Sequence, residues 1–352
     1  MKASKCKACG VPRAVSKGHE WTGGGAIVSR KNPTYRMIFW EGGYISRVLK
    51  ITEDMIGIPL DRMVIELARK ASREYVASYI HPVALKIIER VALKAFTRNL
   101  LSLLQAYGFG EATLESVRYR KGDDDYLNVK VKNPYYLPSC AGTLLGGVEA
   151  VCGREGSVRS EEIAPGEFLL NAYISDHPVE FSGRLNIHHY AVKPGDIAYE
   201  RCPSCGSPVE LSAYDWDTER GIITRKHDGV RMALGAFGIY DALIKDLEEE
   251  LGEHIPRLVV ESARRFATEG RFEKELVRHE GMLRRGLALQ GLGNLREYTL
   301  ERDGMRVRLE NACLPLIMAG TFQGFFEIVT GRRGEVEWDY ADDGDLRVRV
   351  YT

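Results

Sequence analysis

The chain has 352 residues, of which 44% are apolar and 28% charged, a composition typical of a globular protein. Lys and Arg together number 49, as do Asp and Glu, so no overall electrostatic field would attract nucleic acid or an anionic membrane. We therefore expect neither of them as a partner. The length predicts two domains of roughly 150 residues each.

The N-terminal stretch MKASKCKACG carries lysines without a following apolar segment, so it does not resemble a secretory signal. No run in the chain approaches the ~20 apolar residues that a membrane span needs. We therefore expect a cytoplasmic location. In that reducing compartment, seven cysteines, an odd number with two C-x-x-C pairs, indicate metal binding or buried thiols rather than disulfides.

The first predicted element is a metal-binding turn, KCKACGVP at 5–12, and RCPSCGSP at 201–208 repeats its cysteine spacing, its glycine and its proline. One C-x-x-C pair supplies two ligands, whereas a structural zinc site needs four. Neither His19 nor His227 has a counterpart in the other copy, so each turn does not complete a site of its own. We therefore predict one shared structural zinc. Its ligands are Cys6, Cys9, Cys202 and Cys205.

Two other interpretations of the cysteines stay open. A rubredoxin-like iron would use the same four thiolates. A dithiol redox motif also has the C-x-x-C pattern, although neither pair opens a helix after a strand as that motif requires. A zinc with four thiolates has no open coordination position, so we expect a structural rather than a catalytic role.

The two turns belong to an internal duplication. Trp21 corresponds to Trp216, the run IVSRK at 27–31 to IITRK at 222–226, and ELARKA to ESARRF further along the chain. The duplication defines two repeats. Repeat one is expected at 1–175, with a zinc knuckle at 1–31, helices at 42–107 and a ββαββ unit at 112–175; a connection follows at 176–200; and repeat two is expected at 201–352, with a knuckle at 201–226, helices at 236–290 and a ββαββ unit at 294–352.

Each knuckle is followed by a short apolar strand, at 26–29 or 221–224, and then by amphipathic helices. The last of these helices is predicted at 83–107 in repeat one and at 271–290 in repeat two. Period-two alternation then predicts an antiparallel hairpin, one apolar helix and two more strands. The apolar helix is expected at 137–152 and at 315–330. The fold class is therefore α+β, with two tandem pseudo-symmetric repeats, each a knuckle, an amphipathic helical part and an antiparallel ββαββ unit.

The apolar helix carries paired glycines four residues apart, which lie on one helical face and favour close packing against another element over contact with a ligand. These are Gly142 and Gly146 in repeat one, and Gly320 and Gly324 in repeat two. Glu149 and Glu327 extend the same face by one turn. We expect them to be solvated or cap-bonded carboxylates, with a catalytic acid as the alternative.

The pattern N-P, A-G-x-x-x-G, a glutamate three residues later, G-R and an acidic turn ending in glycine resembles the 4-vinyl reductase domain family, over 112–175 and 294–352. The resemblance implies a small-molecule-binding α+β fold that pairs as dimers, with an apolar pocket between helices and sheet. The fold is shared with haem nitric-oxide sensors and a Golgi transport component. The duplication would supply that dimer in one chain, which can also pair again. Members of the family carry zinc-binding cysteines in the last hairpin, where this chain has Ile163 and Ala341.

The resemblance also implies which residues line the pocket, with a purely structural core as the alternative. In repeat one they are Tyr135, Tyr136, Leu137, Cys140, Leu144 and Glu149, and in repeat two Leu314, Met318, Phe322, Phe325 and Glu327. The unequal sets allow a single functional pocket, and His188 or His189 of the connection is a candidate partner for it.

The function that this resemblance implies is binding of a hydrophobic or aromatic small molecule, as a sensor or carrier that works with a protein partner. The alternative is an enzyme, or an accessory subunit of one, acting on an apolar or tetrapyrrole-like substrate. The sequence has no Ser-His-Asp order, P-loop or H-E-x-x-H motif to support catalysis. A zinc-ribbon adaptor for nucleic acid would need a basic face, and the only duplicated basic pairs flank strands.

Overall fold

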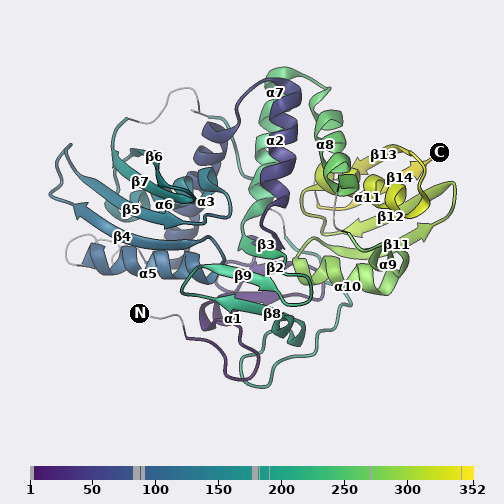
Figure 1. Ribbon diagram of the computed structural model, residues 1–352, viewed down its shortest axis with the longest axis horizontal. Coiled ribbons are helices and arrows are strands. Elements are labelled where there is room, and N and C mark those ends of the chain that lie inside the picture. Colours follow the sequence, from purple (N-terminus) through teal and green to yellow (C-terminus); the bar gives the residue numbers. More distant parts are fainter. Residues whose placement is uncertain are drawn as a thin grey trace.

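The computed structural model describes residues 4–81, 88, 92–176, 181, 183–189, 191–269, 272–341 and 343–352. It is a mixed α+β protein whose strands form three antiparallel sheets. Figure 1 shows two of these sheets on opposite sides of the molecule, with α2 and α7 between them and the third sheet below. Within the described residues, no helix combines the length and the apolar character needed to cross a membrane.

The lower sheet has six strands in the order β1-β2-β3-β10-β9-β8, three from each predicted repeat. Its strands are β1 (His19–Trp21), β2 (Ile27–Ser29), β3 (Arg36–Glu41), β8 (Tyr214–Asp217), β9 (Ile222–Arg225) and β10 (Arg231–Gly235). Only β2 and β9 were predicted from the sequence. The central strands β3 and β10 are almost wholly buried, so their side chains do not alternate and give no period-two signal.

The other two sheets have four strands each and the same order, β4-β5-β7-β6 and β11-β12-β14-β13. The first comprises β4 (Glu111–Arg118), β5 (Tyr126–Lys132), β6 (Gly156–Ala164) and β7 (Glu167–Ile174), and the second β11 (Asn294–Leu300), β12 (Gly304–Glu310), β13 (Glu335–Tyr340) and β14 (Leu346–Tyr351). Between the hairpins of each sheet lies one helix, α6 (Leu137–Cys152) or α11 (Pro315–Thr330), with the predicted bounds. Alternating burial along β5, β12 and β14 matches the period-two pattern.

The helical parts also correspond. They are α2 (Tyr44–Ile56), α3 (Asp61–Tyr79) and α5 (Leu93–Ala106) in the first half, and α7 (Tyr240–Leu251), α8 (Ile255–Glu269), α9 (Lys274–Arg278) and α10 (Glu280–Gln290) in the second; a short α1 (Arg13–Gly18) follows the first turn. Of the helix predicted at 83–107, α5 confirms the C-terminal part, while residues 83–87 and 89–91 lie outside the described residues.

The prediction of a single helix at 271–290 is wrong, because this segment forms two helices, α9 and α10, which are separated at His279. His279 has φ −103° and ψ 99°, outside the helical region. The carbonyl of Val277, which would accept a bond from Gly281 in a continuous helix, accepts one from the Tyr298 hydroxyl at 2.6 Å instead. A tertiary contact to β11 therefore replaces the local helical bond.

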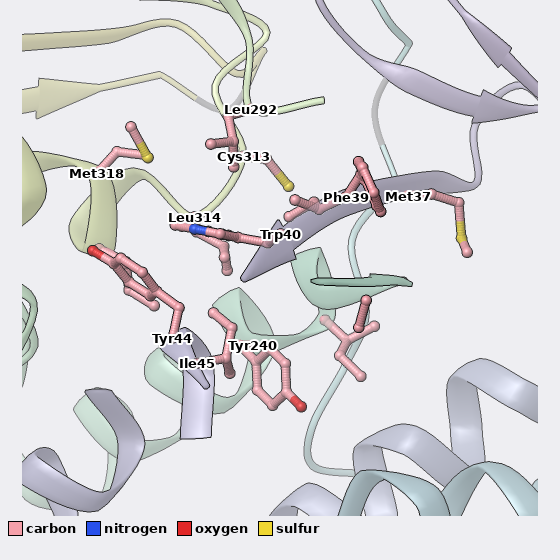
Figure 2. Packing of buried hydrophobic residues seen from close by; sticks show 14 of the residues in the cluster. Met37, Phe39, Trp40, Tyr44, Ile45, Tyr240, Leu292, Cys313, Leu314 and Met318 are labelled. Carbon is pink, nitrogen blue, oxygen red and sulfur yellow. The ribbon is translucent and has the colours of Figure 1, made fainter. Parts of the chain in front are cut away.

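Helices of each half also pack against helices of the other half. α3 packs on α6 within the first half and α8 on α11 within the second, but α2 of the first half packs against α8, and α7 of the second half against α3. One large apolar core runs through the whole molecule as a result, and a smaller one lies under the sheet of β4 to β7. Figure 2 shows part of the large core, where Trp40 and Tyr44 of the first half meet Leu314 and Met318 of the second.

Candidate metal centre and pockets

The four cysteines of the two predicted turns come together, as the shared site requires. Their sulfur atoms all lie within 4.8 Å of one another, with 3.9 Å between Cys6 and Cys202 and 3.4 Å between Cys9 and Cys205. A tetrahedral zinc with Zn–S bonds of about 2.3 Å places its sulfurs about 3.8 Å apart. Three of the four cysteines are buried. The donor set therefore fits a metal ion of the tetrahedral thiolate class.

The two turns have the same backbone conformation. Cys6 N–H donates to Val11 O and Cys202 N–H to Ser207 O, both at 2.8 Å. The glycine after each pair, Gly10 or Gly206, has a φ of 77° or 76°, in the left-handed region that side chains with a Cβ rarely adopt. This explains why the sequence C-x-x-C-G occurs in both.

Hydrogen bonds favour the thiolate in part of the cluster. The Ser204 side chain, together with the backbone at Cys9 and Ala8, lowers the pKa of Cys6 to about 6, and backbone bonds lower that of Cys202. Burial raises the pKa of Cys9 to about 12. Four thiolates this close repel one another, so a cation is needed before all of them lose their protons.

Strands β3 and β10 bring the two knuckles together. They pair antiparallel, and Phe39 lies opposite Leu234. Arg36 on β3 and Arg231 on β10 occupy corresponding positions, and each donates hydrogen bonds to backbone carbonyls of the opposite half at 2.7 to 3.5 Å. The acceptors are Gly291, Asn311 and Ala312 for Arg36, and Gly108, Asn133 and Pro134 for Arg231.

The predicted acids of the apolar helices are paired. Glu149 Oε2 accepts from Arg69 at 2.7 Å, and Oε1 accepts from Gly156 N–H at 2.8 Å. In the second half, Glu327 makes the same two bonds, to Arg264 at 2.7 Å and to Gly334 N–H at 3.3 Å. Neither acid is the solvated carboxylate that had been expected; each is largely buried and bonds an arginine of another helix. Both acids fix the apolar helix to the preceding long helix and to the next strand.

The paired glycines of the apolar helices serve close helix packing, as the sequence favoured. A Cβ at Gly142 or Gly146 would collide with the backbone of α3, at the carbonyls of Ile65 and Arg69. A Cβ at Gly320 would collide with the carbonyl of Val260 in α8, and a Cβ at Gly324 with the Cβ of Ala267. These positions therefore exclude every residue but glycine unless the helices separate.

The predicted pocket residues of the first half lie around small apolar cavities. Tyr135, whose hydroxyl bonds Ser139 at 2.6 Å, lines a cavity of about 70 Å³ between α3, α5, α6 and the end of β10. Cys140 and Leu144 line one of about 20 Å³ beneath the sheet, and Glu149 lines one of about 40 Å³ near the end of α6. Tyr136 stands before the first residue of α6 and is partly exposed.

The predicted residues of the second half lie in the core instead: Met318, Phe322 and Phe325 are 3% exposed or less, and Glu327 is held by Arg264. Two substitutions explain why the first half keeps a cavity. Ala71 of the first half and Gly235 of the second line the 70 Å³ cavity, whereas at the pseudo-symmetric place their counterparts are the large residues Phe266 and Trp40. The rings of Trp40 and Phe266 each pack on Tyr44, with centroids 4.4 Å apart (Figure 2 labels Trp40 and Tyr44).

A larger pocket was not predicted. It measures about 470 Å³ and is lined by residues of both halves and of the connection, including Asp241, Arg36, Cys313, His188 and His189. The two histidines had been singled out in the sequence, but Asp241 lacked any signal, because it is an acid in the first turn of an amphipathic helix, where acids are common. The pocket around Asp241 is formed by segments far apart in the sequence, so it is seen only in the tertiary structure.

No protein-family model, no curated protein and no solved structure matches the chain.

Proposed function

We propose that this protein is a zinc-stapled, fused pseudo-dimer of the 4-vinyl reductase type, which binds a hydrophobic or aromatic small molecule and acts in the cytoplasm as a sensor or carrier with a protein partner. The observation that carries the proposal is the four-cysteine cluster, in which two ligands come from each of two turns far apart in the chain. In a dimer of separate chains, such a site would sit on the two-fold axis.

The reciprocal contacts support the pseudo-dimer. Arg36 and Arg231 each hold the opposite half, and Gly293 N–H donates to Gly25 O at 3.1 Å while Gly110 N–H donates to Gly221 O at 2.9 Å. An interface in which each partner uses the same surface has this property. The zinc would cross-link the two halves at one end of that interface, and its four thiolates would leave no position for a substrate.

The asymmetry of the core supports one ligand per chain. The 70 Å³ cavity is lined almost wholly by apolar side chains, among them Leu100, Leu103 and Val76, with aromatic rings from Tyr35 and Tyr75. Apolar cavities of about 150 Å³ bind benzene. A ligand with an aromatic ring therefore requires side chains of this cavity to shift, whereas at the pseudo-symmetric place the rings of Phe266 and Trp40 both pack on Tyr44.

The enzyme alternative gains no support from the acids that the sequence singled out. Glu149 and Glu327 both bond an arginine and a backbone N–H, so they occupy structural positions rather than facing a substrate. Cys140 is buried, and burial raises the pKa of its thiol to about 12, which removes the thiolate that a nucleophile needs.

Native mass spectrometry with elemental analysis of the purified protein tests both parts of the proposal. We expect one zinc per chain and an apolar adduct. Ala71→Phe fills the cavity of the first half and should remove the adduct while leaving the zinc. Phe266→Ala is the matched variant, since it opens the corresponding space in the second half.

The two parts fail separately. Two metals per chain, or iron, would contradict the shared zinc but not the ligand. An adduct retained in full by the Ala71→Phe variant would exclude this cavity as the binding site of the adduct. A protein that carries zinc but never an apolar molecule would agree with the shared zinc site and contradict the role as a carrier or sensor.

A further inference from the structure

The 470 Å³ pocket lies where five segments meet. They are the start of β3, the connection at 186–189, the first three turns of α7, the start of α11 and the turn between β13 and β14. Pockets of roughly 300 to 1,000 Å³, mostly apolar with a few converging polar groups, are typical of small-molecule sites. This pocket has apolar walls from Ile239, Ala242, Ile244 and Leu316.

Asp241 lines this pocket together with two other acids, Glu248 and Asp345, and it is half-buried. Its Oδ2 accepts a hydrogen bond from the backbone N–H of Leu314 at 3.3 Å. Among the residues that the structure describes, no basic side chain lies within ion-pairing distance of it. Burial raises the pKa of Asp241 to about 7.

The donor to this carboxylate has an unusual backbone conformation. Leu314 has φ 59° and ψ 57°, in the left-handed region, although it is not a glycine. At the corresponding position of the first half, Tyr136 has an ordinary extended conformation with φ −159°. Strained backbone conformations of this kind are concentrated at ligand sites and active sites. Here the conformation presents a backbone N–H to Asp241.

The pocket is not a product of the duplication. The residue that corresponds to Asp241 is Ser46, a small neutral side chain whose hydroxyl donates a hydrogen bond to Gly43 O. Cys313 corresponds to Tyr135, and the connection that supplies His188 and His189 occurs once. The carboxylate therefore occurs in one half of the chain and not in the other, so the fold that the two halves share does not depend on it.

We propose that this pocket binds a small molecule with a cationic amine on an apolar body, the amine being held by the Asp241 carboxylate and the body by the walls of α7 and α11. An amine donates charge-assisted hydrogen bonds and neutralises the enclosed acid. The apolar body covers Ile239 and Leu316 and removes them from water. The site is separate from the zinc and from the 70 Å³ cavity, with which it shares the wall of Tyr35, Ala236 and Ile239.

Charged and titratable groups reach this pocket from every segment around it. They are Arg36 from β3, His188 and His189 from the connection, Lys245 and Glu248 from α7, Cys313 before α11, and Tyr340 and Asp345 beside the β13–β14 turn. Arg36 directs its Nη atoms to three backbone carbonyls, and Asp345 pairs with Lys193 at 2.8 Å. Glu248 adds to the negative potential that an amine would meet, and Lys245 is exposed.

Three probes that share one ring separate the chemical classes: benzylamine, benzyl alcohol and benzoate. Their dissociation constants are measured at pH 8 by ligand-observed NMR titration of the full chain. We expect benzylamine to bind at least about tenfold more tightly than benzyl alcohol, and benzoate to bind most weakly. Asp241→Asn should weaken benzylamine about tenfold or more while changing benzyl alcohol little.

Two further variants fix the location. Ala341→Trp, at the exposed rim of the pocket, should weaken all three probes without changing the charge of Asp241. Glu249→Gln removes a charge from the exposed face of the same helix and should leave benzylamine binding unchanged, as should Ala71→Phe, which fills only the neighbouring cavity. Benzylamine binding that is undetectable, no tighter than that of benzyl alcohol, or equal in the Asp241→Asn protein would overturn the proposal, whatever the fate of the apolar adduct.

Discussion

Phe39 of β3 lies opposite Leu234 of β10, and the two residues hold corresponding positions in the two halves of the chain. Because the strands are antiparallel, Trp40 then faces Ala233, and Ile38 faces Gly235. Each pairing is thus repeated with the halves exchanged, which is the geometry of a two-fold axis passing between Phe39 and Leu234. The four cysteines form a second contact between the halves, at the knuckles.

The cysteine cluster should contribute strongly to stability when it holds its metal. We expect Cys202→Ser to abolish stoichiometric zinc and to lower the free energy of unfolding by about 4 kcal/mol or more, since metal binding to a site absent from the unfolded chain adds directly to folding. Urea unfolding with and without a chelator measures this. Cys152→Ser, outside the cluster, is the control. Equal denaturation midpoints for the Cys202→Ser and parent proteins would mean that the cluster is not a staple.

The two arginines that cross between the halves should matter equally. Replacement of Arg36 by Met removes bonds to three carbonyls of the second half, and Arg231→Met does the same for the first. Since carbonyls left without donors are costly, we expect each change to destabilise by about 2 to 3 kcal/mol. Chemical denaturation tests this, with the exposed Arg333→Met as control. A loss confined to one of the two variants would contradict a reciprocal interface.

Much of the fold could be predicted where local pattern and tertiary structure agree. The bounds of α6 and α11 follow from a continuous apolar segment between two turns, and each helix ends at a glycine with positive φ, Gly153 or Gly331. The shared cysteine site could be predicted because a tetrahedral ion needs four donors and neither turn had more than two.

What depends on the second half of the chain could not be predicted. β3 and β10 are strands because they pair with each other across the interface, and α9 ends where Tyr298 takes a helical carbonyl. The asymmetry of the core rests on two positions, Ala71 against Phe266 and Gly235 against Trp40, whose neighbours only the tertiary structure reveals. Asp241 is the same case, since its pocket is built from five separate segments.

The corresponding acids Glu149 and Glu327 should differ in their effect on stability. The Arg69–Glu149 pair is almost fully buried, with side chains 5% and 2% exposed, whereas Arg264 and Glu327 are 14% and 11% exposed. Removing one partner of a buried pair costs roughly 3 to 5 kcal/mol when the other charge is left uncompensated, but Arg69 keeps its pair with Glu66 and Arg264 its pair with Glu261. We therefore expect Glu149→Gln to destabilise by about 2 kcal/mol and Glu327→Gln by less. Urea midpoints of the two single variants provide the comparison, and the reverse order would contradict the burial argument.

Asp241 should make the protein less stable as the pH rises from about 4 to 7. Its pKa is raised to about 7 in the folded chain from an ordinary value near 3.8, because burial disfavours the carboxylate. Between these two values the folded state keeps a proton that the unfolded state releases, so the free energy of unfolding falls with increasing pH. The loss is at most about 4 kcal/mol at pH 8, and less to the extent that water in the pocket solvates the charge.

Asp241→Asn removes this titration, so the variant should unfold at a higher temperature than the parent protein at pH 8 and gain little at pH 4. Melting temperatures measured across this range test the sign directly. Glu249 lies on the exposed face of the same helix, so Glu249→Gln should leave the melting temperature unchanged at both pH 4 and pH 8. A variant that loses stability at pH 8 would mean that the Asp241 carboxylate is compensated in the folded chain, and that the pocket holds no unpaired charge for an amine to neutralise.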